Sequence, residues 1–196
     1  MRIKIQMPVT LALMALSTSA LAHPGHDALD HGASAFSVGF LHPFNGMDHL
    51  LAMLAIGIWA AQTGGRAIWQ VPAAFLAMLC LGGILGMNGI ALPNVELGVA
   101  SSLVIFGALI ASAKKLSVNA GTLVAGVFAL FHGAAHGMEI PTMASGLGYS
   151  VGFIAASLAL HVSGLFAVHT TRLAPQAVRY IGAVIAGVGM ALLGSI

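Results

Sequence analysis

The sequence predicts an all-α integral membrane protein, a bundle of about six transmembrane helices that follows a cleaved signal peptide. The 196 residues include only 7 basic and 5 acidic ones, whereas about a quarter of the residues in soluble domains are charged. Hydrophobic residues make up 59% of the chain, which could not cover a water-facing surface. The 25 glycines allow helices to approach closely in lipid, and Gly82/Gly86 and Gly133/Gly137 have the four-residue spacing of such contacts.

Residues 1–22 have the features of a secretory signal peptide. Arg2 and Lys4 precede an apolar run over residues 7–16, and small residues lead to a cleavage point after Ala22. The run is short for a transmembrane span and is followed by polar residues, although an uncleaved first helix is the alternative. Cleavage would leave equal numbers of basic and acidic residues, so we expect no basic patch for nucleic acid.

The uncharged stretches that follow predict six helices in one transmembrane domain, residues 36–196. A hydrocarbon core about 30 Å thick needs about 20 helical residues, and each stretch reaches this length, the last only just. Joints rich in glycine, proline or charged residues separate the stretches. The expected helices cover residues 36–62, 68–90, 95–112, 118–138, 144–168 and 178–196.

The basic residues predict the orientation of the bundle. A cleaved signal peptide places the new N-terminus outside, so the joints after the first, third and fifth helices should be cytoplasmic and basic. Those joints hold every basic residue that follows the signal peptide, namely Arg66, Lys114, Lys115, Arg172 and Arg179. The sequence therefore predicts a multi-pass protein of the cytoplasmic membrane, with the N-terminus and the C-terminus both outside the cytoplasm.

The first polar cluster lies in the expected first helix, at residues 42–49, His-Pro-Phe-Asn-Gly-Met-Asp-His. Ionisable residues within a bilayer are costly enough that function is the default explanation. In a continuous helix His42 and His49 return to nearly the same face, and Asp48 is placed to ligate a metal or to orient a histidine. The proline and the glycine disfavour a regular helix, so we expect a bend or an opening in this cluster.

The second polar cluster ends the expected fourth helix, at residues 131–139, Phe-His-Gly-Ala-Ala-His-Gly-Met-Glu. His132 and His136 are one turn apart and Glu139 returns to the face of His132, so the three are expected to converge. Imidazoles with a carboxylate suit Ni²⁺, Co²⁺, Zn²⁺ or Cu²⁺. The predicted orientation puts both clusters in the external half of the membrane, where together they could surround one ion. The alternative is that these histidines only join neighbouring helices by hydrogen bonds.

Further histidines give weaker signals. The external tail, residues 23–35, contains His23, His26 and His31 with two acidic residues, which either collect dilute metal ions or form a solvated leader. His161 stands apart in the inner half of the expected fifth helix. It is either a ligand on the exit side or a hydrogen-bonding group between helices.

The two clusters resemble the motifs of the HupE/UreJ proteins, small bacterial permeases associated with nickel supply to hydrogenases and ureases. The family's first-helix motif, His-Pro-x-x-Gly-x-Asp-His, is matched at every specified position, and its fourth-helix motif is similar to the second cluster. The resemblance extends to the signal peptide, the histidine after it and the six-helix plan. It implies that the metal is handled by His42, Asp48, His49, His132, His136 and Glu139.

The resemblance implies uptake of a divalent transition-metal ion, nickel or cobalt, across the inner membrane of a bacterium. The ion is the cargo, so no tightly bound cofactor is expected, and the expected partners are the ion and the lipid bilayer, with a homo-oligomer left open. The sequence has no Gly-x-x-x-x-Gly-Lys-[Ser/Thr] loop for a nucleotide.

Two alternatives are a membrane haem protein with paired histidine ligands and, ranked below it, a metal-dependent membrane enzyme. The enzyme ranks lower because the sequence lacks a His-Glu-x-x-His motif. The sequence therefore predicts that the protein is not an enzyme.

Overall fold

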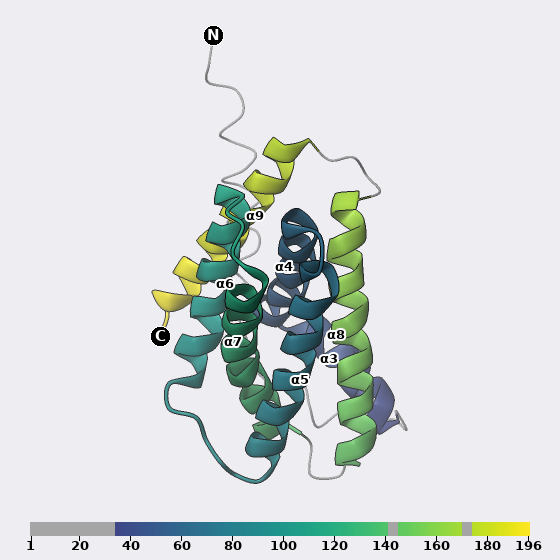
Figure 1. Ribbon diagram of the computed structural model, residues 1–196. Coiled ribbons are helices and arrows are strands. Elements are labelled where there is room, and N and C mark those ends of the chain that lie inside the picture. The colour runs from purple at the N-terminus through teal and green to yellow at the C-terminus, as the bar shows by residue number, and fades with distance from the viewer. Residues whose placement is uncertain (1–33, 141–144, 170–173) are drawn as a thin grey trace.

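The computed structural model describes residues 34–140, 145–169 and 174–196, and over these ranges the chain is helical with no strand. The helices run alongside one another as a bundle (Figure 1). They are α3 (Ala35–Asn45), α4 (Met47–Thr63), α5 (Ala67–Met87), α6 (Val95–Ser112), α7 (Val118–Met138), α8 (Gly146–His169) and α9 (Pro175–Leu193). The predicted all-α fold is confirmed. The predicted signal peptide and the histidines of the external tail lie outside the described residues.

The membrane spans follow from the length and composition of these helices. Each helix from α5 to α9 is long and apolar enough to cross a membrane, and α3 and α4 meet the same test only as a pair. The pair is bent by 84°, so the described residues contain five helices able to span a membrane, or six spans if the bent pair counts as one. These apolar helices make the chain a multi-pass membrane protein.

The expected first helix, residues 36–62, is divided into two helices within the cluster where a bend or an opening was expected. Gly46 separates α3 from α4 with an extended backbone, φ −107° and ψ 121°. Glycine is unfavourable within a helix because it loses the most conformational entropy there. Pro43 inside α3 has no amide hydrogen to continue the helical hydrogen bonds. A bend was expected at this cluster, but the sharp turn means that His42 and His49 belong to different helices.

The last helix begins three residues earlier than predicted. Proline is favoured in the first turn, where its missing amide hydrogen has no helical partner to lose, and α9 begins with Pro175. Arg179 therefore lies on α9 instead of in the preceding joint, and its Nε donates a hydrogen bond to the carbonyl of Ala111, at 2.7 Å. This bond ties the beginning of α9 to the end of α6.

Small residues bring the backbones of α5 and α7 together. A Cβ atom on Gly82 would overlap the backbone of Leu130, and one on Gly133 would overlap the backbone of Leu79. The spacing of these glycines had indicated close helix packing, which lipid-embedded helices achieve through small side chains. α6 packs on α9 in a similar way, while α3 and α4 both pack on α8.

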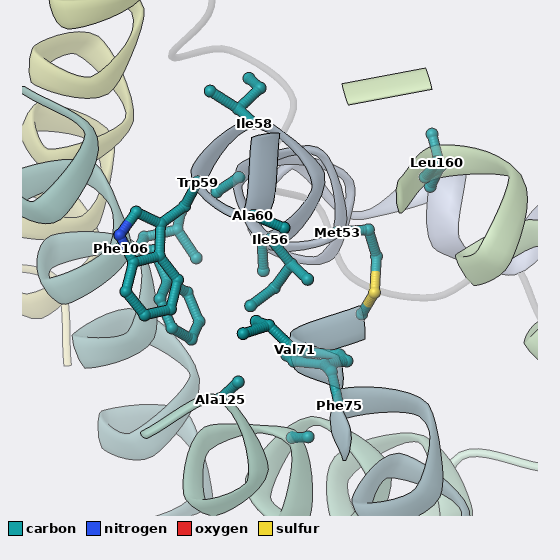
Figure 2. Close-up of a cluster of buried hydrophobic side chains, with 14 of the residues drawn as sticks. Met53, Ile56, Ile58, Trp59, Ala60, Val71, Phe75, Phe106, Ala125 and Leu160 are labelled. Carbon is teal, nitrogen blue, oxygen red and sulfur yellow. The ribbon is translucent and has the colours of Figure 1, made fainter. Parts of the chain in front are cut away.

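The apolar core surrounds α4 (Figure 2). Met53 and Trp59 of α4 are fully buried, as are Phe75 of α5 and Phe106 of α6. In Figure 2 the Trp59 ring lies beside Phe106, and their centroids are 6.3 Å apart. This packing holds α4 in the middle of the bundle and thereby fixes the position of the polar residues at its N-terminal end.

Basic and acidic residues lie at opposite ends of the bundle. The Trp59 indole nitrogen donates a hydrogen bond to the carbonyl of Lys114, at 3.3 Å, so α4 and α6 end close together beside basic residues. Glu96 at the start of α6 and Glu139 after α7 line a pocket of about 390 Å³ at the other end. The pocket reaches the second polar cluster.

Candidate metal site

The break at Gly46 shapes the first part of the site. Asp48 lies in the first turn of α4, and its Oδ1 accepts hydrogen bonds from the backbone nitrogen of His49, at 2.8 Å, and from Nδ1 of the His49 ring, at 2.9 Å. An ionised carboxylate can only accept, so Nδ1 carries the proton and the lone pair is on Nε2. That Nε2 atom is buried and has no hydrogen-bond partner within the described residues. Asp48 thus orients His49 so that the Nε2 lone pair is available to ligate a metal ion.

Replacing Gly46 with alanine is expected to disturb this pair. A Cβ atom on residue 46 would lie 2.7 Å from Oδ1 of Asp48 and 3.3 Å from Nδ1 of His49. Because carboxylate and ring are already hydrogen-bonded to each other, the carboxylate must turn away, and we expect an apparent affinity for metal about tenfold weaker in uptake assays. Membrane abundance should stay near normal.

The matched control is Gly187→Ala in α9, because a Cβ atom there meets open space. Metal uptake with wild-type affinity in the Gly46→Ala protein would contradict a role for the Asp48–His49 geometry.

A serine that the sequence reasoning missed orients the histidine at the base of the site. Ser102 of α6 donates its hydroxyl hydrogen to the carbonyl of Val99, at 2.6 Å, and lies 2.8 Å from Nε2 of His132. Since the hydroxyl has one hydrogen, His132 must donate from Nε2, which leaves the lone pair on Nδ1. His132 is fully buried, and Nδ1 has no hydrogen-bond partner in the described part of the chain. In the sequence, Ser102 was marked only by being a polar residue within an apolar stretch.

We expect Ser102→Ala to weaken metal affinity by about 10-fold to 100-fold, because loss of a group that orients a ligand typically has this effect. The comparison is Ser163→Ala, since among the described residues that exposed hydroxyl bonds to the carbonyl of Ala159 on its own helix. Equilibrium dialysis of the purified proteins with radiolabelled nickel measures both affinities. Equal affinities would show that the Ser102 hydroxyl does not support the site.

The outer part of the site joins α3 to the end of α7. Nε2 of His42 lies 3.2 Å from Oε2 of Glu139, and Nδ1 of His136 lies 3.4 Å from the same oxygen. One ligand atom from each of these three residues lies within 4.8 Å of the others, a spacing that could hold a metal ion. The contacts with His136 and His42 lower the pKa of Glu139, so this carboxylate stays ionised.

Contacts between imidazole rings link the two parts of the site. The His42 and His136 ring centroids are 4.6 Å apart, and those of His136 and His49 are 3.8 Å apart. The His49 ring lies 4.8 Å from that of His132. Four histidines from two sequence clusters therefore form a continuous row from the exposed Glu139 to the buried His132.

The grouping of these residues differs from the one expected on α7. We expected Glu139 to share a helical face with His132, but α7 ends at Met138 and Glu139 has left the helix, with φ −95° and ψ 0°. Glu139 consequently lies against His136 and His42, while His132 bonds to Ser102. The site therefore has two groups. The outer group is His42, His136 and Glu139, and the inner group is His49 and His132, where the Asp48 carboxylate acts through its hydrogen bond to His49.

Two further side chains bear on the site. Tyr149 of α8 is buried with its ring centroid 5.6 Å from that of His42, and its hydroxyl has no hydrogen-bond partner among the described residues. No sequence pattern distinguished Tyr149 from the other aromatic residues. His161 of α8 is also buried, but it lies beyond Phe75 and outside both groups.

Comparison with known proteins relates nearly the whole chain to one family. The family model described as HupE / UreJ protein matches residues 11–192. The chain is similar to Protein HupE of Rhizobium leguminosarum bv. viciae, with 43% identity over 190 residues that cover 96% of this chain and 97% of that protein. No solved structure matches the chain.

Proposed function

Because this chain belongs to the HupE/UreJ family, we propose that it is a secondary permease for uptake of a divalent transition-metal ion. The ion proposed is Ni²⁺, with Co²⁺ as the second candidate, and its destination is a metalloenzyme such as a hydrogenase or a urease. The metal is cargo, so the protein binds it only in passing. The family that the two histidine motifs suggested is confirmed by the match over nearly the whole chain.

One observation supports this function above the others. His42 comes from the first motif and His136 and Glu139 from the second, yet one ligand atom of each lies within 4.8 Å of the other two. Imidazole nitrogen and carboxylate oxygen together favour borderline divalent metals over Mg²⁺ and Ca²⁺, which prefer oxygen ligands. In the lipid-spanning part of a protein such a set is costly to maintain without a function.

The geometry suggests how the ion would move. The exposed Glu139 carboxylate lines the pocket at the acidic end of the bundle and would attract a dication from water. His42 and His136 would replace part of its hydration shell, and the ring contacts lead from His136 to His49. The histidines would offer several successive binding positions. Each would bind the ion weakly enough to release it to the next, as conduction requires.

Orientation and driving force belong to the same proposal. We place the basic end, where Lys114 lies, in the cytoplasm and the acidic end outside, with both termini outside, in the inner membrane of a bacterium. Moving a dication inward down a potential of 100 mV is worth about 4.6 kcal/mol, twice the value for one charge. This is enough for an accumulation of roughly a thousandfold without ATP.

Uptake of radiolabelled nickel and cobalt into proteoliposomes tests the proposal. Wild-type protein should accumulate one or both ions when the inside is negative and should lose the gradient when the potential is collapsed. Empty liposomes and liposomes with excess Mg²⁺ are the controls. Failure to transport any divalent transition metal would contradict the proposal, and a Soret absorption band in the purified protein would favour the haem alternative.

A further inference from the structure

His161 is a buried imidazole whose hydrogen-bonding capacity is unused. It lies in the middle of α8, is only 2% exposed, and neither ring nitrogen has a hydrogen-bond partner within residues 34–140, 145–169 and 174–196. The two serines near it in sequence do not serve it, because the Ser157 hydroxyl bonds to the carbonyl of Phe153 and that of Ser163 to the carbonyl of Ala159. A role in joining helices by hydrogen bonds is therefore not supported.

Close packing of two helices fixes the position of His161 in the core. A Cβ atom on Gly57 of α4 would overlap the backbone carbonyl of His161, and one on Gly164 of α8 would overlap that of Leu54. α4 and α8 therefore touch through their backbones at this level. Gly57 is two turns beyond His49 on α4, which is roughly 12 Å along the helix axis.

One aromatic ring contacts both His161 and the inner histidine of the metal site. The Phe75 centroid lies 5.3 Å from that of His161, with the rings perpendicular, and 5.9 Å from that of His132. Figure 2 shows the end of the Met53 side chain pointing toward Phe75, and both residues belong to the buried apolar core. The Phe75 ring therefore lies against both His161 and the inner end of the histidine row.

We propose that His161 is a second, inner binding position for the transported dication, separated from the outer histidine row by the Phe75 ring. The inference rests on the proposed function, since it assigns a further step to the same path. A single imidazole offers one lone pair, so this position binds more weakly than the outer group and suits release toward the cytoplasm. The outer group captures the ion, and His161 receives it after it has passed Phe75.

The test separates capture from turnover. Equilibrium dialysis of purified protein with radiolabelled nickel reports capture, and the maximal rate of nickel uptake into proteoliposomes reports turnover. In His161→Phe, which keeps an aromatic ring of similar size, we expect nickel affinity within about twofold of wild type and a maximal uptake rate about tenfold lower. His161→Cys, which restores a metal ligand, should recover part of the rate.

Control variants make the result specific. Ser157→Ala removes a buried polar group from the same helix and should leave both quantities unchanged, because within the described part of the chain its hydroxyl bonds to the Phe153 carbonyl of its own helix. If His161→Phe does not accumulate in the membrane, His161→Gln keeps a polar side chain with little affinity for metal. It should show the same loss of turnover.

Three outcomes overturn the inference. A normal maximal rate in His161→Phe or His161→Gln would mean that no ligand is needed at this position. Equal losses of rate in His161→Phe and His161→Cys would assign a packing role to the residue. A wild-type protein that transports no divalent metal would contradict the proposed function and this inference with it. If the wild-type protein transports the metal and the His161 variants have a normal maximal rate, this inference alone is overturned.

Discussion

Replacing His136 with alanine is expected to abolish uptake at low metal concentration. Its ring lies between those of His42 and His49, and its Nδ1 is 3.4 Å from the Glu139 carboxylate, so it is the residue that joins the outer group to the inner one. Loss of a supporting group alone can lower metal affinity by about 10-fold to 100-fold, and loss of a ligand should cost at least as much. Initial uptake rates over a range of nickel concentrations measure the effect.

The control for this variant is His169→Ala. His169 is the exposed last residue of α8, so its removal changes the histidine count without changing the site. Membrane abundance of both variants is measured by immunoblot, because His136 is buried and its loss leaves a cavity. Unchanged nickel affinity in a well-expressed His136→Ala protein would refute the site.

Replacing Glu139 with glutamine should be nearly as damaging, for an electrostatic reason. Glutamine keeps the shape of the side chain and can still hydrogen-bond to His42, but it removes the negative charge that the outer group offers to a dication. We expect the metal concentration for half-maximal uptake to rise by about 10-fold to 100-fold, while the maximal rate changes less. Uptake kinetics with nickel and with cobalt measure the two parameters separately.

A shorter carboxylate distinguishes charge from packing at this position. Glu139→Asp retains the negative charge at the exposed mouth of the site and should recover a substantial part of the lost affinity. If aspartate is as poor as glutamine, geometry and not charge determines the defect. If glutamine is as good as the native residue, the carboxylate is not a ligand.

The membrane spans could be predicted closely because their signal is local. The expected helices at residues 95–112 and 118–138 match α6 and α7, since turn residues interrupt the apolar sequence on both sides. The first span was predicted less well. The argument that His42 and His49 share one helical face assumes that the helix continues between them. Pro43 and Gly46 indicated a disturbance, but the 84° bend is a property of α3 and α4 packed on α8, which no local pattern contains.

The site could be predicted as a set of residues but not as an arrangement. Both motifs stood out as ionisable groups in an apolar sequence, and the structure brings their side chains together. Their grouping depends on where α7 ends and on which helices are neighbours, so the pairing of Glu139 with His42 was not foreseen. Ser102 and Tyr149 were missed because a serine and a tyrosine in a membrane helix are common without any role.

The packing of the broken first span on α8 has a consequence for biosynthesis. Once Glu139 has been synthesised both histidine motifs have been made, yet the helix against which α3 and α4 lie begins only at Gly146. Until then α4, which has 17 residues with Asp48 and His49 at its start, is a short insertion segment that carries two ionisable groups. Its contacts with α8 close a loop of about a hundred residues, and such long-range contacts form late. α8 thus completes the packing of α3 and α4, so a chain released before α8 would carry both motifs in the bilayer without the bundle that brings them together.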